Sequence, residues 1–243
     1  MIKQAIIPLA GLGTRLLPLT SVIPKELLPI NGKPGLEYIL DECIGAGIKE
    51  IILVISSKKK IIKKYFYNDN FFKKIIKKKQ KDLRLKFEYS KIKKYKKMIK
   101  FVYQDTPLGT GDAILKCRKI IKSEHFLMLL PDDLIIKNNC SRAMIKLHNK
   151  YNSCIIASKK VNKKDVARWG IFKLENYIKK DFIIKDVIEK PSVKSAPSNQ
   201  AIIGRYILPS KIFGILKKQR PGQNGEIHIT DAIRALIKNK NKF

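Results

Sequence analysis

The sequence has few acidic residues and no long apolar run. Its 243 residues contain 20 acidic side chains against 52 lysines and arginines, which gives a formal net charge of +32 at pH 7. No apolar stretch approaches the ~20 residues that a helix needs to cross a bilayer. The first residues also lack the long apolar core and the cleavage site of a signal peptide. We therefore expect a cytoplasmic protein without a membrane span.

Residue spacings typical of metal or redox sites are also missing. The three histidines are scattered, and no Ser/His/Asp or Cys/His arrangement for covalent catalysis is present. The four cysteines are Cys43, Cys117, Cys140 and Cys154. We expect reduced thiols that are mostly packed in the interior.

Half of the excess positive charge is concentrated in residues 58–100, which hold 18 lysines and one arginine against three acidic residues. A basic segment with aromatic residues is typical of nucleic-acid binding. However, Ile61, Ile62, Tyr65 and Phe66 recur at positions i, i+1, i+4 and i+5, which is the apolar stripe of an amphipathic helix. We favour helices whose aromatic residues are mostly core and whose lysines face water. Nucleic acid is then not the expected partner, although a basic nucleic-acid-binding protein stays open as an alternative.

Apolar, β-branched runs alternate with helical patterns along the first part of the chain. Such alternation indicates a sheet with parallel strands and helices on both faces. Predicted strands are 4–9, 50–56, 99–103 and 126–130, with helices at 36–46 and 109–121. Later strands are expected at 153–161, 170–174, 183–189 and 201–208, with short helices at 210–217 and 230–238. The pattern predicts an α/β fold with a Rossmann-like, mixed but mainly parallel sheet flanked by helices.

A glycine-rich loop directly follows the first predicted strand. It consists of Ala10, Gly11, Leu12, Gly13, Thr14 and Arg15. Two glycines allow backbone N–H groups to turn toward an anion, although the loop matches neither a P-loop nor a complete dinucleotide fingerprint. An ordinary turn explains the glycines alone equally well. Arg15, whose planar fork suits triphosphate oxygens, and Lys25, which lies between Pro24 and Pro29, favour a phosphate site.

Acidic residues follow another buried strand, where Pro131 precedes Asp132 and Asp133. Open α/β sheets bind their ligands at the carboxyl ends of the strands. Magnesium takes hard oxygen ligands and often only one or two carboxylates, with phosphates and water completing its shell. Asp132 is the candidate metal ligand, and an acidic pair that opens a turn is the alternative.

Together these residues resemble the bacterial nucleotidyltransferases that make sugar nucleotides, above all the UTP–glucose-1-phosphate uridylyltransferases. The signature Gly-x-Gly-Thr-Arg-x-x-Pro-x-Thr-x-x-x-Pro-Lys is present at 11–25. Segment 104–113 resembles the stretch that recognises uracil, and 130–132 resembles the metal-binding strand end. Later segments that match family motifs are 168–170, 187–191, 196–206 and 225–233. The last two favour the uridylyl over the thymidylyl branch.

The resemblance implies one nucleotidyltransferase domain over residues 1–243, with a nucleotide-binding half at 1–150 and a sugar-phosphate-binding half at 151–243. It implies uridylyl transfer from UTP to glucose 1-phosphate with Mg²⁺ as cofactor, and it allows a homo-oligomer. The implied catalytic residues are Arg15 and Lys25, with Asp132 as metal ligand. The implied nucleotide-binding residues are Ala10, Gly11, Leu12, Gly13, Thr14, Gln104 and Gly109. The implied sugar-phosphate-binding residues are Gly170, Glu189 and Lys190.

Two departures from the family pattern shape these expectations. Asp112 stands where relatives often have histidine, which adds negative charge near the nucleotide. Family members continue past the equivalent of Ile237 with a segment that contains Asp-Cys-Gly and a second carboxylate near the metal, whereas this chain ends at Phe243. We therefore expect the sugar-phosphate half to be truncated at its C-terminus. A homologue that binds nucleotide with little turnover is the alternative.

Overall fold

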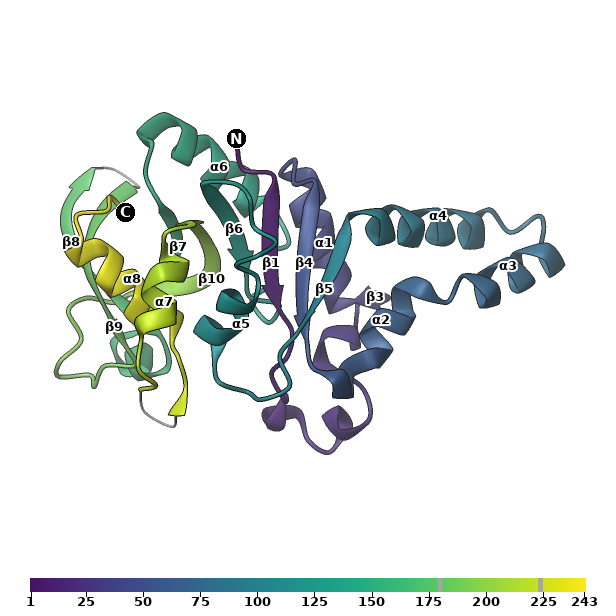
Figure 1. Cartoon of the computed structure of the whole chain (residues 1–243), viewed down its shortest axis with the longest axis horizontal. Helices are drawn as coiled ribbons and strands as arrows, with labels where there is room; N and C mark the ends of the chain where they lie inside the picture. Colours follow the sequence, from purple (N-terminus) through teal and green to yellow (C-terminus); the bar gives the residue numbers. More distant parts are fainter. Residues whose placement is uncertain (179–180, 223–224) are drawn as a thin grey trace.

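An eight-stranded mixed sheet forms the centre of the molecule in the computed structural model, which describes residues 1–178, 181–222 and 225–243 (Figure 1). The strand order is β5-β4-β1-β6-β10-β8-β9, and β7 pairs with β10. Four neighbouring strands are parallel, namely β5 (Ile99–Tyr103), β4 (Glu50–Ile55), β1 (Gln4–Pro8) and β6 (His125–Leu129). Antiparallel pairing joins β7 (Ile155–Lys160), β8 (Gly170–Ile178), β9 (Asp181–Glu189) and β10 (Gln200–Pro209) to this half. The predicted mixed α/β fold is confirmed.

Both faces of the parallel strands are buried, because successive side chains of a strand point to opposite faces. In β1, Ile6 belongs to one core cluster, whereas Ala5 and Ile7 belong to the other. Helices α5 (Thr110–Lys116), α7 (Ile212–Lys218) and α8 (Ile229–Lys238) supply residues to the Ile6 cluster. Helices α1 (Gly35–Gly45) and α6 (Cys140–Tyr151) supply the other. This double burial explains why the strands read as continuous apolar runs.

A buried ion pair joins β10 to α1, and its arginine, Arg205, has no solvent exposure. The Arg205 guanidinium donates to both carboxylate oxygens of Glu42, with Nη2 2.7 Å from Oε2. The same side chain donates to the carbonyl oxygens of Leu130 and Gly204. Its charge and its donors are thereby satisfied inside the core, as a buried arginine requires.

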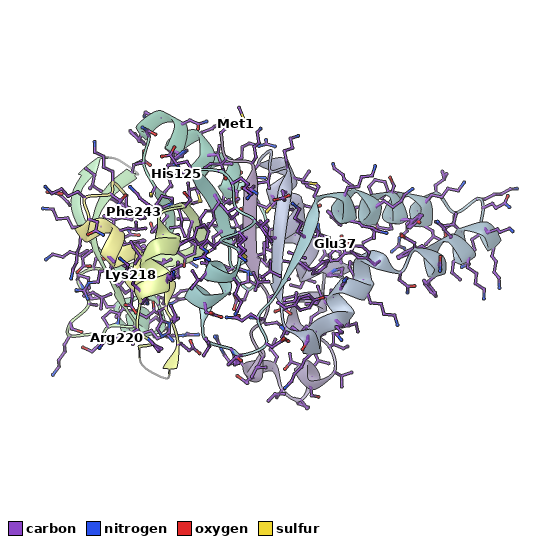
Figure 2. All side chains as sticks on the ribbon, viewed as in Figure 1. Met1, Glu37, His125, Lys218, Arg220 and Phe243 are labelled. Atoms are coloured by element: carbon purple, nitrogen blue, oxygen red, sulfur yellow. The ribbon has the colours of Figure 1, made fainter. Side chains whose placement is uncertain are left out.

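Most of residues 58–100 lie in the lysine-rich helices α2 (Lys60–Tyr67), α3 (Asp69–Lys78) and α4 (Leu83–Met98). Figure 1 shows α3 and α4 as a hairpin that projects from the body, and Figure 2 shows long side chains extending outward along it. Phe66, Tyr89 and Tyr95 are buried as expected. Phe71 and Phe87 are exposed instead, because a two-helix hairpin has only one inner face on which to bury aromatic rings.

Short elements complete the fold. They are the 3-10 turns η1 (Thr14–Leu16), η2 (Leu19–Ser21), η3 (Lys25–Leu27), η4 (Ser57–Lys59) and η5 (Lys163–Arg168), and the strand pair β2 (Pro29–Ile30) and β3 (Lys33–Pro34). Three of the turns lie in the long connection between β1 and α1. Within the described residues, no helix is long and apolar enough to cross a membrane.

Candidate active site

The parallel strands bring their carboxyl ends to one edge of the sheet, where the predicted site residues follow. The Leu9 N–H, just after β1, donates to the Val54 carbonyl of β4 over 2.7 Å. The Gln104 N–H, just after β5, donates to the Ile55 carbonyl of β4 over 2.9 Å. Leu130, just after β6, donates to the Gly204 carbonyl of β10 over 2.8 Å. Residues far apart in the chain therefore meet at this edge.

The glycine-rich loop turns sharply at Gly13, whose φ of 71° favours glycine. The Thr20 hydroxyl donates to the Gly13 carbonyl oxygen over 2.9 Å and folds the loop back on itself. A Cβ atom at Gly13 would lie 3.2 Å from the Thr20 methyl group. Gly13 precedes η1, which carries Arg15 on the exposed side of the loop. The exposed loop backbone and Arg15 are thus open to an anionic ligand.

Lys25 and Asp132 meet across the sheet edge, with Nζ 3.0 Å from Oδ2. Burial raises the pKa of Asp132, but the attraction of Lys25 and the more distant Arg15 outweighs burial, so the pKa lies below its ordinary value. The Asp132 side chain remains half exposed. Three predicted residues, Arg15, Lys25 and Asp132, therefore lie within electrostatic range of one another.

A buried ion pair between Lys59 and Glu26 holds the segment that carries Lys25 in place. The Lys59 ammonium lies 3.0 Å from both carboxylate oxygens of Glu26 and donates to the Leu9 carbonyl oxygen over 2.7 Å. Glu26 is 3% exposed and Lys59 is 8% exposed. Because Glu26 follows Lys25 directly, the pair fastens η3 to the end of β1.

Gln104 and Gly109 form a second group after β5. The Gln104 side-chain Nε2 donates to the Gly109 carbonyl oxygen over 3.0 Å and to Asp112 Oδ2 over 2.8 Å. Gly109 has a φ of 92°, and a Cβ atom there would lie 2.8 Å from the Ile227 carbonyl oxygen. The Ile227 N–H donates to the Leu108 carbonyl oxygen over 2.8 Å, so this loop is packed closely against the segment before α8.

The predicted sugar-phosphate residues lie at the junction of β8 and β9, where Gly170 is paired with Glu189. The Thr230 hydroxyl at the start of α8 donates to Glu189 Oε2 over 2.7 Å. A Cβ atom at Gly170 would lie 3.3 Å from the same oxygen. Lys190 follows with a φ of 45° and donates its backbone N–H to the Trp169 carbonyl oxygen. The four residues therefore form one compact group.

Tyr206 connects this group to Asp132. Burial raises the pKa of the Tyr206 hydroxyl, and the carboxylates of Glu189, Asp133 and Asp132 raise it further. Asp133 itself accepts a hydrogen bond from the Gly204 N–H over 2.7 Å. Glu189, Asp133 and Asp132 are therefore all near enough to Tyr206 to influence the same buried phenol.

The carboxylate oxygens at this edge suit a hard divalent cation that is also coordinated by a bound phosphate ligand. Across the described residues, no three His, Cys, Asp or Glu side chains form a group that could hold a metal ion. A single carboxylate such as Asp132 fits Mg²⁺ when phosphate oxygens and water fill the remaining positions.

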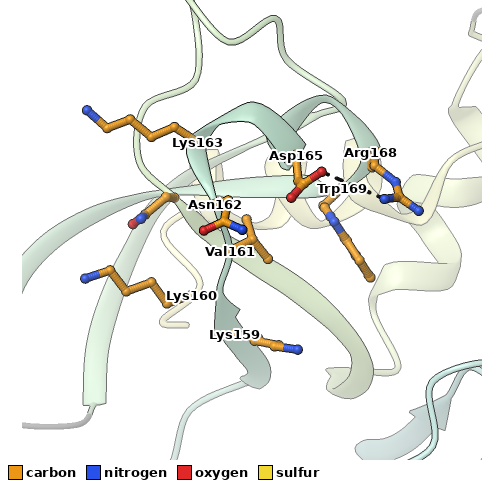
Figure 3. Close-up of a pocket in the computed structure, with 9 residues that line it drawn as sticks. Lys159, Lys160, Val161, Asn162, Lys163, Asp165, Arg168 and Trp169 are labelled. Atoms are coloured by element: carbon orange, nitrogen blue, oxygen red, sulfur yellow. Dashed lines mark ion pairs between the residues drawn. The ribbon is translucent and has the colours of Figure 1, made fainter.

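An open pocket of about 550 Å³ lies elsewhere, between the end of β7 and η5 (Figure 3). Lys160, Asn162, Asp165, Arg168 and Trp169 are among its lining residues. Arg168 and Asp165, both on η5, form a loose ion pair of 3.8 Å on one side of it. None of the predicted site residues lines this pocket, so we assign it no part in the phosphate site.

Sequence reasoning missed several residues that the structure brings to the site. They are Glu26, Lys59 and Thr230, whereas Asp112 and Asp133, both noted in the sequence, have Gln104 and the Gly204 N–H as partners. The sequence also suggested scattered histidines, but the rings of His125 and His148 lie 4.6 Å apart, beside the opposite end of β6. Only Glu26 had a local signal, because it is part of the Pro-Lys-Glu segment after the loop.

Comparisons with known proteins identify relatives of this chain. The family described as Nucleotidyl transferase matches residues 4–243. A UTP–glucose-1-phosphate uridylyltransferase of Staphylococcus saprophyticus is 41% identical over 97% of this chain and 82% of its own length. Another, from Streptococcus pyogenes serotype M1, is 37% identical over 100% of this chain and 81% of its own length.

Solved structures extend the comparison. A UDP-glucose pyrophosphorylase complexed with UDP-glucose has a TM-score of 0.86 and 36% identity, over 100% of this chain and 89% of its own. A UTP-bound enzyme from Acinetobacter baumannii has a TM-score of 0.88 and 33% identity, over 100% of this chain and 84% of its own. The resemblance inferred from the motifs is confirmed. The chain belongs to the nucleotidyl transferase family.

Proposed function

We propose that this protein joins UTP and glucose 1-phosphate to give UDP-glucose and pyrophosphate. The observation that carries the proposal is the pairing of Lys25 with Asp132, 3.0 Å apart and within range of Arg15, at the carboxyl edge of the parallel strands. Without ligand, these opposite charges satisfy one another. A triphosphate with its cation can replace both partners, since phosphate oxygens take the lysine and the cation takes the carboxylate.

The reaction needs alignment and charge neutralisation and no general base. A phosphate oxygen of glucose 1-phosphate, already ionised at neutral pH, attacks the α-phosphorus of UTP as the bond to pyrophosphate breaks in line. Arg15 and Lys25 bind the triphosphate and offset the negative charge that develops on the leaving pyrophosphate. The backbone N–H groups of the glycine-rich loop, residues 10–14, add dipoles aimed at the same oxygens.

Asp132 would hold the divalent cation of this reaction, proposed here to be Mg²⁺. When bound, the cation neutralises phosphate charge and keeps the reacting groups in register. The attraction of Lys25 lowers the pKa of Asp132 despite its burial, which favours the ionised form that a cation binds. Lys25 then serves as the second charge that the triphosphate meets at this edge.

The remaining predicted residues divide between the base and the sugar. Gln104 and Gly109 lie after β5 and are assigned to the uracil edge. The backbone of Gly170 and the carboxylate of Glu189 are assigned to glucose hydroxyls, and Lys190 to the phosphate between sugar and nucleotide. Support for the sugar assignment comes from Thr230, which fixes the Glu189 carboxylate through a 2.7 Å hydrogen bond. We also infer a cytoplasmic location, which four free thiols would suit.

A pyrophosphate-release assay with glucose 1-phosphate, Mg²⁺ and each of the four nucleoside triphosphates tests the proposal. We expect release with UTP, and a Lys25→Met variant should lose roughly 10²–10³-fold in kcat, as enzymes do when a preorganised charge partner is removed. An exposed-lysine variant, Lys58→Met, should behave as wild type. Binding of UTP without release above background would instead support the nucleotide-binding homologue.

A further inference from the structure

The Gln104 side chain is held in a single orientation inside the protein. Gln104 is 5% exposed and Asp112 is 7% exposed. The Nε2 atom of Gln104 donates to Asp112 Oδ2 over 2.8 Å and to the Gly109 carbonyl oxygen over 3.0 Å. An amide nitrogen carries two hydrogens, so both are used by these two partners.

The chemistry of the partners decides which way the amide points. A backbone carbonyl and a carboxylate both accept hydrogen bonds, so neither can face the amide oxygen without leaving it against another acceptor. Nε2 must therefore point toward Gly109 and Asp112. The Oε1 atom is directed away from them as a free acceptor.

That acceptor lies at the ligand-binding edge of the sheet. Gln104 directly follows β5, and its backbone N–H is bonded to the end of β4. The end of β4 also binds Leu9, which precedes the glycine-rich loop. Neighbouring strands lie about 4.8 Å apart and β4 lies between β5 and β1, so the ends of β5 and β1 are roughly 10 Å apart along this edge. One nucleotide can therefore reach from the glycine-rich loop to Gln104.

We propose that Asp112 determines the base selectivity of the enzyme by locking Gln104 with Oε1 presented to N3 of the base. This inference rests on the proposed function and names the feature that selects uridine triphosphate. Uracil carries a hydrogen on N3 and donates it to Oε1. Cytosine has a lone pair on N3, which faces the Oε1 lone pairs and leaves a buried acceptor unpaired. Asp112 is a positioning residue, because it acts through Gln104.

Neighbouring residues fix the position of Gly109 and partly offset the charge of the Asp112 carboxylate. Gly109 is held by its positive φ and its close packing against Ile227. Lys116, one turn along α5, lies 3.7 Å from the Asp112 carboxylate. The negative charge expected near the nucleotide is therefore turned toward Gln104 and Lys116.

The test compares kcat/KM for UTP, CTP and 5-methyl-UTP in wild type and in Asp112→Ala. Wild type should prefer UTP strongly over CTP, and the variant should lose at least about tenfold of that preference, because one of two acceptors that orient the amide is gone. The ratio of 5-methyl-UTP to UTP should not change, since both bases carry a hydrogen on N3. A purely structural role would lower all three values together and leave the UTP:CTP ratio intact, which would overturn the inference.

Two further variants complete the design. Asp112→Asn keeps an acceptor oxygen and should retain most of the UTP:CTP ratio, whereas Lys116→Gln removes the other partner of Asp112 and should leave the ratio unchanged. Equilibrium binding of UTP and CTP to the same variants measures the preference without turnover. The wild-type protein should also reject 3-methyl-UTP, which lacks the hydrogen on N3, and this measurement needs no variant. A wild type that releases no pyrophosphate with UTP contradicts the proposed function, whereas one that uses UTP and CTP equally contradicts the selectivity inference alone. An Asp112→Ala ratio equal to that of a selective wild type contradicts only the role of Asp112.

Discussion

Lys59 and Glu26 form a buried ion pair next to the segment that carries Arg15 and Lys25, the residues proposed to bind the triphosphate. The Lys59 ammonium contacts both Glu26 carboxylate oxygens at 3.0 Å and the Leu9 carbonyl oxygen at 2.7 Å. Burial lowers the pKa of the Lys59 ammonium, and the attraction of Glu26 offsets this only in part. Leu9 directly precedes the glycine-rich loop and Glu26 follows Lys25. The pair thus fixes both ends of the segment that presents Arg15 and Lys25.

Replacing Lys59 by methionine should destabilise the fold. The change leaves the Glu26 carboxylate buried without a partner, which typically costs about 3–5 kcal/mol. Urea unfolding should show this loss in the free energy of unfolding, whereas Lys58→Met, at an exposed neighbouring lysine, should change it by less than about 0.5 kcal/mol. The double variant Lys59→Met/Glu26→Gln should recover part of the loss because no unpaired charge remains. A Lys59→Met protein as stable as wild type would contradict the role of the pair.

The pKa of Asp132 should depend on Lys25. Burial raises this pKa and Lys25 lowers it more strongly, so Lys25→Gln should shift the pKa upward, and Arg15→Gln should shift it less. Because the folded-state pKa is below the ordinary value, the ionised form contributes stability above the unfolded-state pKa. That contribution is lost as pH falls through the folded-state pKa. A carboxyl ¹³C NMR titration measures both shifts, and equal titration in wild type and Lys25→Gln would refute the coupling.

Thr230 should affect the sugar substrate and not the nucleotide. Its hydroxyl donates to Glu189 Oε2 over 2.7 Å, and Thr230→Val removes this donor with little change of shape. A lost hydrogen bond of about 1 kcal/mol corresponds to a roughly fivefold higher KM for glucose 1-phosphate. Steady-state kinetics should show the KM for UTP unchanged, and Thr230→Ser should behave as wild type. An equal rise of both KM values would indicate general damage to α8.

Gly109 should not tolerate a side chain. Its φ is 92°, and an added Cβ would lie 2.8 Å from the Ile227 carbonyl oxygen. Gly109→Ala should therefore lower the free energy of unfolding by about 1–3 kcal/mol. Gly214 on α7 is a matched control, because a Cβ there meets no atom within 4 Å and Gly→Ala in a helix stabilises by roughly 0.5–1 kcal/mol. Chemical denaturation of both variants measures the difference, and similar effects at the two sites would disprove the close packing.

The buried thiols should be unreactive in the folded protein. Burial raises the pKa of Cys117 to about 12 and, despite the opposing charge of Lys211, that of Cys154 to about 12. The thiolate is the nucleophile, so at pH 8 almost none is present at either position. Titration with a disulfide reagent should modify the less buried Cys140 first, and all four thiols should react once the chain is unfolded. Fast reaction of Cys117 in the native state would be inconsistent with its burial.

The sequence alone was sufficient to predict the sheet and the edge at which the proposed site residues meet. Apolar runs alternating with helical patterns specify parallel strands, and such strands end at a common edge. For that reason Lys25 and Asp132 could be assigned to one site, and the structure places them 3.0 Å apart. None of the proposed site residues lies at positions 179–180 or 223–224, which are outside the described residues.

Burial of individual charged residues followed no local pattern. Lys58, Lys59 and Lys60 are adjacent lysines in a lysine-rich segment, yet only Lys59 is buried and paired. Phe71 and Phe72 are adjacent as well, and only Phe72 stacks on Tyr89, with ring centroids 5.3 Å apart. The packing of helices and strands against each other decides which lysine and which phenylalanine turns inward. The residues next to it in the chain contribute little to that packing.

The sequence by itself therefore determined the fold class, the position of the glycine-rich loop and the types of side chain at the proposed site. Only the tertiary structure decided the contacts that orient them, such as Glu26 on Lys59, Thr230 on Glu189 and Asp112 on Gln104. The physical reason is that strand and helix patterns arise from local periodicity. The direction of a side chain's hydrogen bond depends instead on which distant donor or acceptor is brought within about 3 Å of it.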